Sequence, residues 1–379
     1  MSPEMVLFEE NSSTRKVILN RPEKLNCLNN QMIFQMLNNF KAYEKDPSVK
    51  LVLLKGNGKS FCVGGDVTAT SNAIIATGHW SFVADVYRKL LTLDYLLATY
   101  NKPLVALING IVMGAGAGLT MHTKFRVVTE NTVFAMPETS IGLFPDAGAS
   151  HFFSRLPGYF GEYLGLTGAQ LDGTEMLASG LATHFILSKD LVSLENALHV
   201  VDSSDVSAIS EIINKFVHQL GIKQDSAYRR LEIINECFSR ETVEEILSSL
   251  ESFAAKKAEK WIIKAINLMK SASPTSLKLS LRSIREGRMQ KLEQCLAREF
   301  KFMCHCFRRT VNDDFYEGVR AMLIDKDRKP KWQPPKLELV SEEMVNQYYS
   351  KVYNDYNDDW ESLQLPVRPN LSFSLESKL

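Results

Sequence analysis

The sequence lacks the features of a membrane or nucleic-acid protein. No apolar run reaches the ~18 residues that a helix needs to cross a bilayer. Neither sign of charge is in excess, since 44 Lys and Arg residues balance 44 Asp and Glu residues. A chain of zero net charge is poorly suited to bind nucleic acid or an anionic membrane as its main partner. We therefore expect a globular protein with neither as a partner.

Cysteine is scarce, and its spacing predicts neither disulfides nor a metal site. The six cysteines are irregularly placed along 379 residues, which does not resemble a disulfide framework. Cys304-His305-Cys306 has no second pair of ligands, and adjacent residues on a helix point apart. We expect structural thiols and no metal.

Several common catalytic motifs are also missing. Residues 113–118, Met-Gly-Ala-Gly-Ala-Gly, lack the spacing of a dinucleotide-binding loop, and no ribose-binding acid is evident downstream. No Gly-Lys-Ser/Thr follows them, which excludes a P-loop, and no Gly-x-Ser-x-Gly elbow occurs. Nucleotide chemistry and a serine-hydrolase triad are therefore unsupported.

The chain does contain strands that alternate with helices and end in glycine-rich turns. Apolar runs at 49–54 and 104–109 read as buried strands, and apolar residues recur at helical spacing from 79 to 99. This alternation is typical of an α/β fold. We predict an α/β core at 1–205, a helical region at 206–340 and an extension at 341–379. No internal repeat is visible.

The last three residues of the sequence, Ser377-Lys378-Leu379, match the tripeptide that the peroxisomal import receptor reads. The first residues contain neither an apolar signal core nor an Arg-rich amphipathic leader. We therefore expect a peroxisomal protein that carries no mitochondrial or secretory leader and that has the import receptor as a partner.

The two glycine-rich turns offer backbone donors. They are Cys62-Val63-Gly64-Gly65-Asp66 and the turn at 113–118, and each follows a strand. A turn that ends a strand and opens a helix presents N–H groups that neither element uses. Two such groups aimed at one point form an oxyanion hole, for which Gly65 and Ala115 are our candidates. Alternatively, the glycines only permit tight turns and close packing.

A third stretch, residues 136–148, holds two carboxylates eight positions apart in an apolar loop, Glu138 and Asp146. Burial raises the pKa of a carboxyl group, so such a pair is a candidate for acid/base or nucleophilic work. With an oxyanion hole, the pair suits acyl chemistry on a thioester. Glu138 would attack the carbonyl or deprotonate water, and Asp146 would orient water, bind a substrate hydroxyl or share the proton. The alternatives are a capping or ion-paired glutamate and a turn-forming aspartate.

These motifs resemble the crotonase (enoyl-CoA hydratase/isomerase) superfamily, and within it the 3-hydroxyisobutyryl-CoA hydrolase branch. The resemblance spans roughly residues 5 to 340. The Pro-Glu-Thr and Phe-Pro-Asp pair at 137–146 separates this branch from ordinary hydratases. The segments that carry the resemblance lie at 20–26, 61–66, 109–114, 134–148, 166–168, 182–184, 273–278, 315–321 and 326–332.

The resemblance implies a spiral of ββα units with a helical C-terminal region. It also implies a short acyl-CoA substrate of valine degradation, no cofactor other than the CoA of the substrate, and frequent homo-oligomers. The matching site residues are the catalytic acids Glu138 and Asp146, the oxyanion-hole donors Gly65 and Ala115, and the substrate- and CoA-binding residues Lys24, Leu25, Gly64, Asp66 and Gly114.

Three positions depart from related patterns. Hydratases of the superfamily carry another glutamate where this chain has Gly118, which disfavours water addition to a double bond. The branch usually has Gly where Ala115 stands, so a methyl group enters the pocket. It also has an acid, followed by Tyr, on the helix before Pro103, where the alignment places Lys89 or Leu90. We therefore expect an acyl pocket less polar than 3-hydroxyisobutyryl-CoA requires.

Three functions remain in view. The first is hydrolysis of 3-hydroxyisobutyryl-CoA or a related short hydroxylated or branched acyl-CoA. The second is a hydratase or isomerase of the same superfamily. The third is a CoA-binding homologue without catalysis, which the departures at Ala115 and Leu90 favour and the two intact acids oppose.

Overall fold

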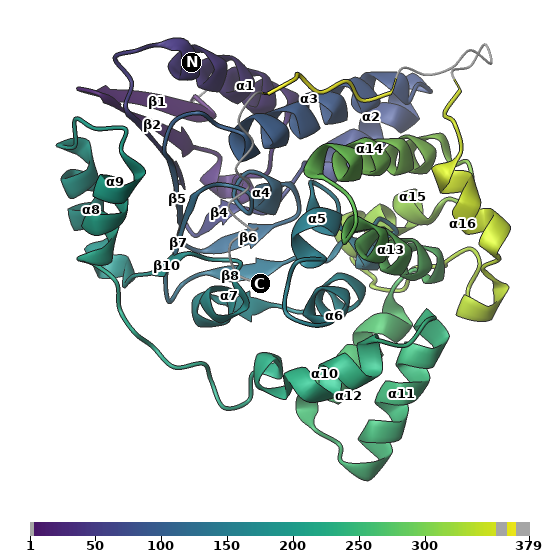
Figure 1. Ribbon diagram of the computed structural model, residues 1–379. Helices are drawn as coiled ribbons and strands as arrows, with labels where there is room; N and C mark the ends of the chain where they lie inside the picture. Colours follow the sequence, from purple (N-terminus) through teal and green to yellow (C-terminus); the bar gives the residue numbers. More distant parts are fainter. Residues whose placement is uncertain (1–3, 354–361, 369–379) are drawn as a thin grey trace.

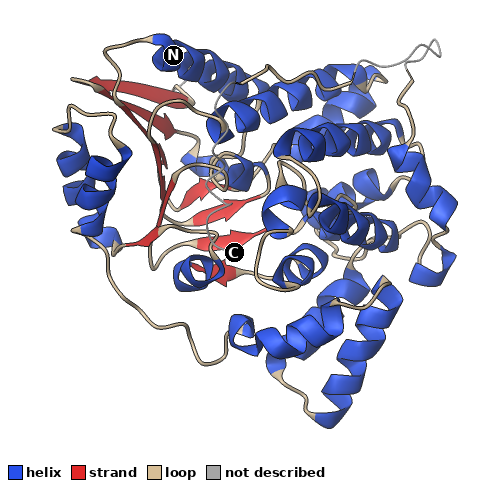
Figure 2. Ribbon diagram, viewed as in Figure 1, coloured by secondary structure: helices blue, strands red, loops and turns tan. Residues whose placement is uncertain are grey.

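The computed structural model describes residues 4–353 and 362–368 (Figure 1). The predicted peroxisomal tripeptide lies outside these residues. Helices predominate and enclose two groups of strands (Figure 2). Among the described helices, none is both long enough and apolar enough to cross a membrane.

The strands form two sheets. Within the described residues, six strands make the first sheet, in the order β1-β2-β3-β5-β7-β10, and four make the second, in the order β4-β6-β8-β9. The first sheet contains β1 (Val6–Asn11), β2 (Thr14–Leu19), β3 (Leu51–Gly56), β5 (Leu104–Ile108), β7 (Phe125–Val128) and β10 (His184–Phe185). The second contains β4 (Ser60–Cys62), β6 (Ile111–Met113), β8 (Val133–Ala135) and β9 (Leu171–Asp172).

Each successive pair of strands adds one strand to the first sheet and one to the second. The pairs β3 and β4, β5 and β6, and β7 and β8 each place one strand in the first sheet and the next in the second. The steps from pair to pair are parallel in both sheets, so each requires a crossover that contains a helix. This arrangement confirms the predicted α/β spiral of ββα units, a structural repeat that leaves no repeat in the sequence.

The helices of the α/β part vary widely in length. Their bounds are α1 (Asn30–Lys45), α2 (Val67–Thr77), α3 (Ser81–Ala98), α4 (Ala115–Gly118), α5 (Ala149–Phe153), α6 (Phe160–Thr167), α7 (Gly173–Ser179) and α8 (Leu191–His199). Asn29 caps α1 by accepting the Met32 N–H at 2.9 Å, as its position before an apolar helical face indicates. Helix α2 was not predicted, because only two of its residues are buried and its pattern is weak.

The C-terminal region is helical, as predicted. Its helices are α9 (Val206–Asn214), α10 (Leu231–Phe238), α11 (Val243–Lys256), α12 (Lys260–Ser271), α13 (Pro274–Gly287), α14 (Leu292–Arg308), α15 (Asp314–Val319), a π-helical turn at Arg320–Ile324, and α16 (Glu342–Tyr349). Ser273 caps α13 and Pro274 takes its first position, where a missing N–H costs nothing. Helix α11 continues to Lys256, so α12 begins only at Lys260.

The first sheet is buried on both faces, and its alternating residues serve different cores. Leu51, Leu53, Val105 and Leu107 pack with α8 and α9, which lie to one side of the sheet in Figure 1. Their neighbours along the strands, such as Val52 and Ala106, belong to the main core instead. Side chains alternate between faces with a period of two, so one apolar run supplies both cores.

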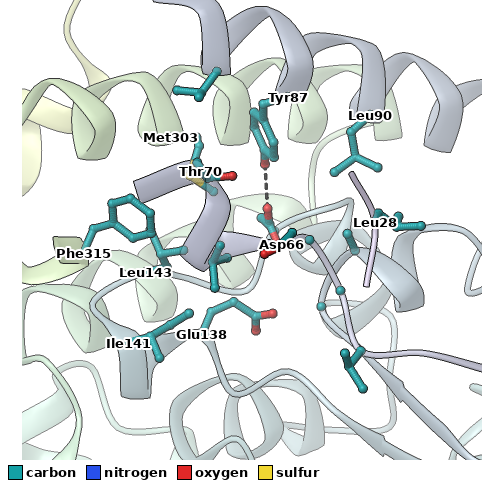
Figure 3. Close-up of a pocket in the computed structure, with 18 of the residues that line it drawn as sticks. Leu28, Asp66, Thr70, Tyr87, Leu90, Glu138, Ile141, Leu143, Met303 and Phe315 are labelled. Carbon is teal, nitrogen blue, oxygen red and sulfur yellow. Dashed lines mark hydrogen bonds between the residues drawn. The ribbon is translucent and has the colours of Figure 1, made fainter. Parts of the chain in front are cut away.

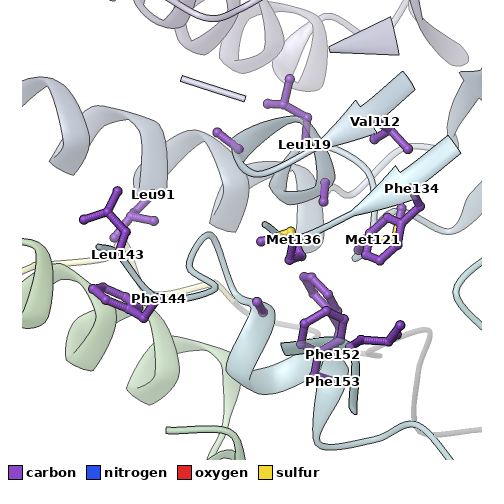
Figure 4. Close-up of a cluster of buried hydrophobic side chains, with 14 of the residues drawn as sticks. Leu91, Val112, Leu119, Met121, Phe134, Met136, Leu143, Phe144, Phe152 and Phe153 are labelled. Atoms are coloured by element: carbon purple, nitrogen blue, oxygen red, sulfur yellow. The ribbon is translucent and has the colours of Figure 1, made fainter. Parts of the chain in front are cut away.

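Part of the main core supports the loop that carries the two acids. Met136 and Leu143 lie within that loop, and they are buried with Leu119, Phe144 and Phe152 (Figure 4). Protein interiors are densely packed, so a loop anchored by several buried side chains has little freedom. The loop is therefore a rigid platform.

Candidate active site

Three turns leave the same edge of the second sheet. Strands β4, β6 and β8 are neighbours and run parallel, so their carboxyl ends meet at one edge. Gly64 and Gly65 follow β4, Gly114 and Ala115 follow β6, and Glu138 follows β8. The order of the strands thus brings together residues that are far apart in sequence.

The two glycine-rich turns contact one another through their backbones. Gly64 and Gly114 have φ angles of 103° and 52°, in the region that favours glycine. A Cβ atom on Gly64 would lie 3.4 Å from the Ala115 nitrogen. Glycine is therefore needed at both positions for conformation, and at Gly114 also for close approach, since a Cβ atom there would lie 2.9 Å from Glu138 Oε1.

The N–H groups of Gly65 and Ala115 are placed to act as donors. Leu28 bridges to the second sheet by bonding the Gly64 carbonyl and the Asp66 N–H, so the Gly65 N–H points away from that pairing. Ala115 is the first residue of α4, and the first N–H groups of a helix have no partner within it. Ala115 has no positive φ, because Gly114 takes the strained conformation instead.

Glu138 points back at these turns. It lies in a 3₁₀ turn (η2, Glu138–Ile141), and its Oε1 would be 2.9 Å from a Cβ atom on Gly114. The side chain is 7% exposed, and its Oε2 has no hydrogen-bond partner among the described residues. Burial, reinforced by the nearby Asp146 carboxylate, raises the pKa of Glu138 well above its usual range.

Asp146 lies in the same cavity and is held by a tyrosine. Its Oδ2 accepts a hydrogen bond of 2.8 Å from the Tyr87 hydroxyl of α3. Burial raises the pKa of Asp146 to about 6, and the bond from Tyr87 acts in the opposite direction. Two buried acids with raised pKa values in one cavity are candidates for acid/base chemistry.

A third buried acid, Glu299 of α14, fixes the turn that follows Asp146. Its carboxylate accepts the Gly148 N–H at 2.8 Å, and the Ser150 N–H and hydroxyl at 3.2 and 2.6 Å. Ala147, between Asp146 and Gly148, has a φ of 55°, which is uncommon for a residue with a side chain. Glu299 therefore holds a strained backbone in place.

The two glycine turns, Glu138, Asp146 and Tyr87 line one cavity of about 320 Å³ (Figure 3). Glu299 does not line it but holds the turn after Asp146. The walls of the cavity are mostly apolar and come from the α/β core and from the C-terminal helices, which supply Met303, Phe307 and Phe315. Glu138 enters from one side, and Tyr87 and Leu90 enter from the opposite wall (Figure 3). A mostly apolar cavity with a few converging polar groups is the usual form of a small-molecule site.

The cavity contains most of the predicted site residues. Seven of them line it: Gly64, Gly65, Asp66, Gly114, Ala115, Glu138 and Asp146. The side chain of Asp66 also caps α2 through the Ala69 N–H at 3.2 Å.

Lys24 and Leu25, predicted to bind CoA, are not among the residues that line the cavity. The Leu25 carbonyl accepts the Val63 N–H at 3.2 Å, so the loop that carries them supports the first glycine turn from outside.

The wall formed by α3 contains residues that sequence analysis missed. Leu90 lines the cavity, but the branch's acid was expected at the wrong position, because α3 carries an acid followed by Tyr four residues later, as Asp94-Tyr95. Tyr87 precedes Leu90 by three residues and Asp94 follows it by four, which places all three on one helical face. The helical spacing of Tyr87 and Asp94 could have indicated a polar role for this face, but the apolar residues around them suggested a core-facing helix. Glu299 gave no such signal, because it meets the site from α14 in the other half of the chain.

Asp94 is buried beside Gly118. It is 1% exposed, and neither of its oxygens has a hydrogen-bond partner within the described part of the chain. A Cβ atom on Gly118 would lie 2.8 Å from its Oδ2, so Asp94 excludes a side chain at that position of α4. Burial and the nearby Asp146 and Glu299 raise the pKa of Asp94 well above its usual range, which favours the neutral form.

A family model and several known proteins match this chain over nearly its whole length. The family model described as enoyl-CoA hydratase/isomerase matches residues 14–349. The chain is 53% identical over 370 residues to probable 3-hydroxyisobutyryl-CoA hydrolase 3 of Arabidopsis thaliana, covering 98% of this chain and 97% of the relative. It is 40% identical over 364 residues to small ribosomal subunit protein mS47 of the same plant, covering 96% and 88%.

A solved structure has the same fold. The carnitinyl-CoA dehydratase from Mycobacterium thermoresistibile superposes with a TM-score of 0.84 at 31% identity, covering 92% of this chain and 97% of that one. At this score the architecture is shared over nearly the whole length.

Proposed function

This chain belongs to the enoyl-CoA hydratase/isomerase family, and we propose that it hydrolyses the thioester of 3-hydroxyisobutyryl-CoA or of a related short hydroxylated or branched acyl-CoA. One observation carries the proposal: Glu138 lines the same largely apolar cavity as Gly65 and Ala115, and its Oε1 lies against the second glycine turn. We take the N–H groups of Gly65 and Ala115 as the two oxyanion-hole donors. The products are the free acid and CoA. CoA is part of the substrate, and the reaction as proposed uses no separate cofactor.

The two N–H groups stabilise the charge that forms on the thioester oxygen. Water addition or carboxylate attack turns the carbonyl into an oxyanion, and fixed donors favour that state over the ground state. The dipole of α4 adds little, because this helix spans only Ala115–Gly118. The donors work in a mostly apolar setting, where each interaction is stronger than in water.

Glu138 can act in either of two ways. As a nucleophile, its carboxylate bonds to the acyl carbon, the carbon–sulfur bond breaks, and water then cleaves the anhydride. As a base, it takes a proton from a water molecule whose oxygen bonds to the acyl carbon, and the proton passes to the leaving sulfur. Asp146 orients the water or carries the proton in both routes.

Hydration of an enoyl-CoA fits the site less well. Position 118 on α4 is glycine, and Asp94 fills the space beside it. Asp94 does not line the cavity, while Asp66 caps α2 and lies 3.5 Å from Arg21. Glu138 and Asp146 are thus the two lining carboxylates without such a structural task.

The lining favours an acyl group with an apolar end. On α3, Val83, Val86 and Leu90 face the cavity, and the Tyr87 hydroxyl already bonds to Asp146. The Ser140 hydroxyl donates to the Pro137 carbonyl at 2.6 Å. A substrate hydroxyl buried against the α3 wall would meet there only the Tyr87 hydroxyl, which already bonds to Asp146, and burial without a partner costs free energy. Among short acyl groups, we therefore favour branched aliphatic ones.

A CoA-binding homologue without catalysis is the alternative from another class. One relative is named as a ribosomal protein, so family membership alone does not decide the question. The discriminating experiment is thiol release from a panel of acyl-CoA thioesters that includes 3-hydroxyisobutyryl-, isobutyryl-, isovaleryl- and crotonyl-CoA. We expect stoichiometric free CoA from the saturated substrates. Loss of enoyl absorbance without thiol would indicate a hydratase, and binding without either change would indicate a non-catalytic homologue.

Cellular placement and assembly stay predictions. We propose a peroxisomal enzyme that binds the import receptor through Ser377, Lys378 and Leu379, and a role in valine degradation follows only if 3-hydroxyisobutyryl-CoA is the preferred substrate. A fluorescent fusion that leaves this tripeptide free should enter peroxisomes, and the same fusion without it should stay outside. Light scattering of the purified chain would show whether it forms homo-oligomers.

A further inference from the structure

Tyr87 lies between the acid site and the C-terminal helices. Its hydroxyl donates to Asp146 Oδ2 at 2.8 Å, and both residues line the cavity (Figure 3). Its ring stacks on Phe300 of α14, with centroids 6.2 Å apart and planes 7° apart. Phe307 meets the ring edge-on at 6.4 Å. The phenol is therefore held on two sides and has little rotational freedom.

The hydroxyl is not needed to fill this space. The cavity-lining neighbours of Tyr87 on α3 are Val83, Val86 and Leu90, so the wall is otherwise apolar. A phenylalanine ring would pack against Phe300 and Phe307 equally well. Placing a hydroxyl in an apolar wall is costly unless it finds a partner, and the partner here is Asp146.

We infer that Tyr87 is a positioning residue for Asp146. It holds one carboxylate oxygen and restricts the side-chain rotamer, which leaves the other oxygen available to the cavity. It also favours the ionised form of Asp146, because it bonds to the oxygen that carries the charge. The inference rests on the proposed hydrolysis, in which Asp146 orients water or carries a proton.

The charges around Asp146 explain why such a donor matters. Asp94 of α3, Glu138 of η2, and Glu299 and Cys306 of α14 interact with it electrostatically. Each of them in its ionised form opposes the negative charge on Asp146, and burial opposes it further. The Tyr87 bond acts in the other direction. Burial raises the pKa of Tyr87 itself, so the phenol keeps its proton and remains a donor.

The test is Tyr87→Phe, with Tyr95→Phe as the matched control. Tyr95 is a buried tyrosine on the same helix, and its hydroxyl bonds to Glu293 at 3.2 Å, away from the cavity lining. For Tyr87→Phe we expect kcat to fall about tenfold with KM within about twofold, since one hydrogen bond to a charged group is lost. The acidic limb of the pH profile should move up by about one unit. Tyr95→Phe should change none of these.

A second measurement decides the inference without using activity. Asp146 can be titrated by carboxyl carbon NMR in protein labelled at aspartate, with Asp146→Asn to assign its signal. The midpoint should be higher in Tyr87→Phe than in the unmodified chain. An unchanged midpoint, or an unchanged kcat and pH profile in an active enzyme, would overturn the inference. Failure of the unmodified chain to release thiol would instead overturn the proposed function and leave the titration as the decisive result.

Discussion

The two sides of the cavity are made of different parts of the protein. One side is the edge of the second sheet, where Gly65, Ala115 and Glu138 line the cavity from the turns that follow neighbouring strands. The other is a wall of side chains from α3 and α14, including Tyr87, Leu90 and Met303. The order of the strands determines the geometry of the sheet edge. The chemical character of the helical wall depends instead on which side chain stands at each position.

This difference separates chemistry from selectivity. Backbone donors survive most substitutions, so the sheet edge preserves the ability to polarise a thioester. The helical wall can change one side chain at a time and alter which acyl group fits. Substitutions on the sheet side should therefore affect turnover of every substrate, and those on the helical side should affect substrates unequally.

The strongest test of the sheet side is Glu138→Gln. The amide keeps the shape of the side chain but neither attacks the carbonyl nor takes a proton, so thiol release should fall by about 10³-fold for every acyl-CoA. The thermal midpoint should not fall, because an acid with a raised pKa gains nothing from ionisation in the folded state. Steady-state thiol assays and thermal unfolding check both statements.

Glu23→Gln is the matched control, since Glu23 is an exposed residue of the loop before α1. It should retain full turnover. Full activity in Glu138→Gln would remove Glu138 from the chemistry and, with it, the distinction between the two sides.

Gly114→Ala should have the next largest effect. The new Cβ atom would lie 2.9 Å from Glu138 Oε1, on a residue whose φ is 52°. Displacement of Glu138 should lower turnover about a hundredfold. The strained backbone should destabilise the fold by at least about 1 kcal/mol, as measured by urea unfolding.

Gly221→Ala is the control for this substitution, because nothing lies within 4 Å of its Cβ position and its φ is not positive. It should be neutral in both assays. A fully active Gly114→Ala would mean that the second glycine turn does not position Glu138.

Leu90→Gln tests the helical side. A polar group on this wall would give a substrate hydroxyl a partner, so the ratio of kcat/KM for 3-hydroxyisobutyryl-CoA over isobutyryl-CoA should rise about tenfold. Leu90→Met keeps the wall apolar and should leave the ratio unchanged. An equal loss for both substrates would show that this wall does not discriminate between acyl groups.

Glu299→Gln should have the smallest effect, on the pH dependence of stability. Burial raises the pKa of Glu299 to about 7, above its value in the unfolded chain. The folded state therefore binds this proton more tightly, and its contribution to stability is lost as pH rises from about 4.5 through 7. Glutamine does not titrate, and its oxygen can still accept from Gly148. The thermal midpoint of the variant should decline less over this range, and an equal decline would contradict the assignment.

The same contrast explains what sequence alone could predict. The glycine turns and the two acids lie in short local motifs, so the sequence is enough to predict that Gly64, Gly65, Gly114, Ala115, Glu138 and Asp146 share one site. Asp66 is predictable in the same way, although its side chain caps α2. Ala115 carries no backbone strain, because Gly114 adopts the positive φ.

The helical wall was harder to predict because its residues come from distant elements. Tyr87 and Asp94 lie within a leucine-rich helical pattern, which predicts only a buried helix. The roles of their hydroxyl and carboxyl groups become visible only when the structure places them near Asp146. Glu299 approaches from α14, more than a hundred residues later in the chain. Lys24 and Leu25 were predicted as ligand contacts, but the structure places them outside the cavity lining.

Hydrolysis in water labelled with ¹⁸O tests the central claim most directly. If the sheet edge activates a thioester carbonyl, multiple turnover of isobutyryl-CoA should give free CoA and isobutyrate that carries one ¹⁸O atom in its carboxyl group, as read by mass spectrometry. With crotonyl-CoA, label at the β-carbon of an intact CoA thioester, together with no labelled acid from isobutyryl-CoA, would contradict the account.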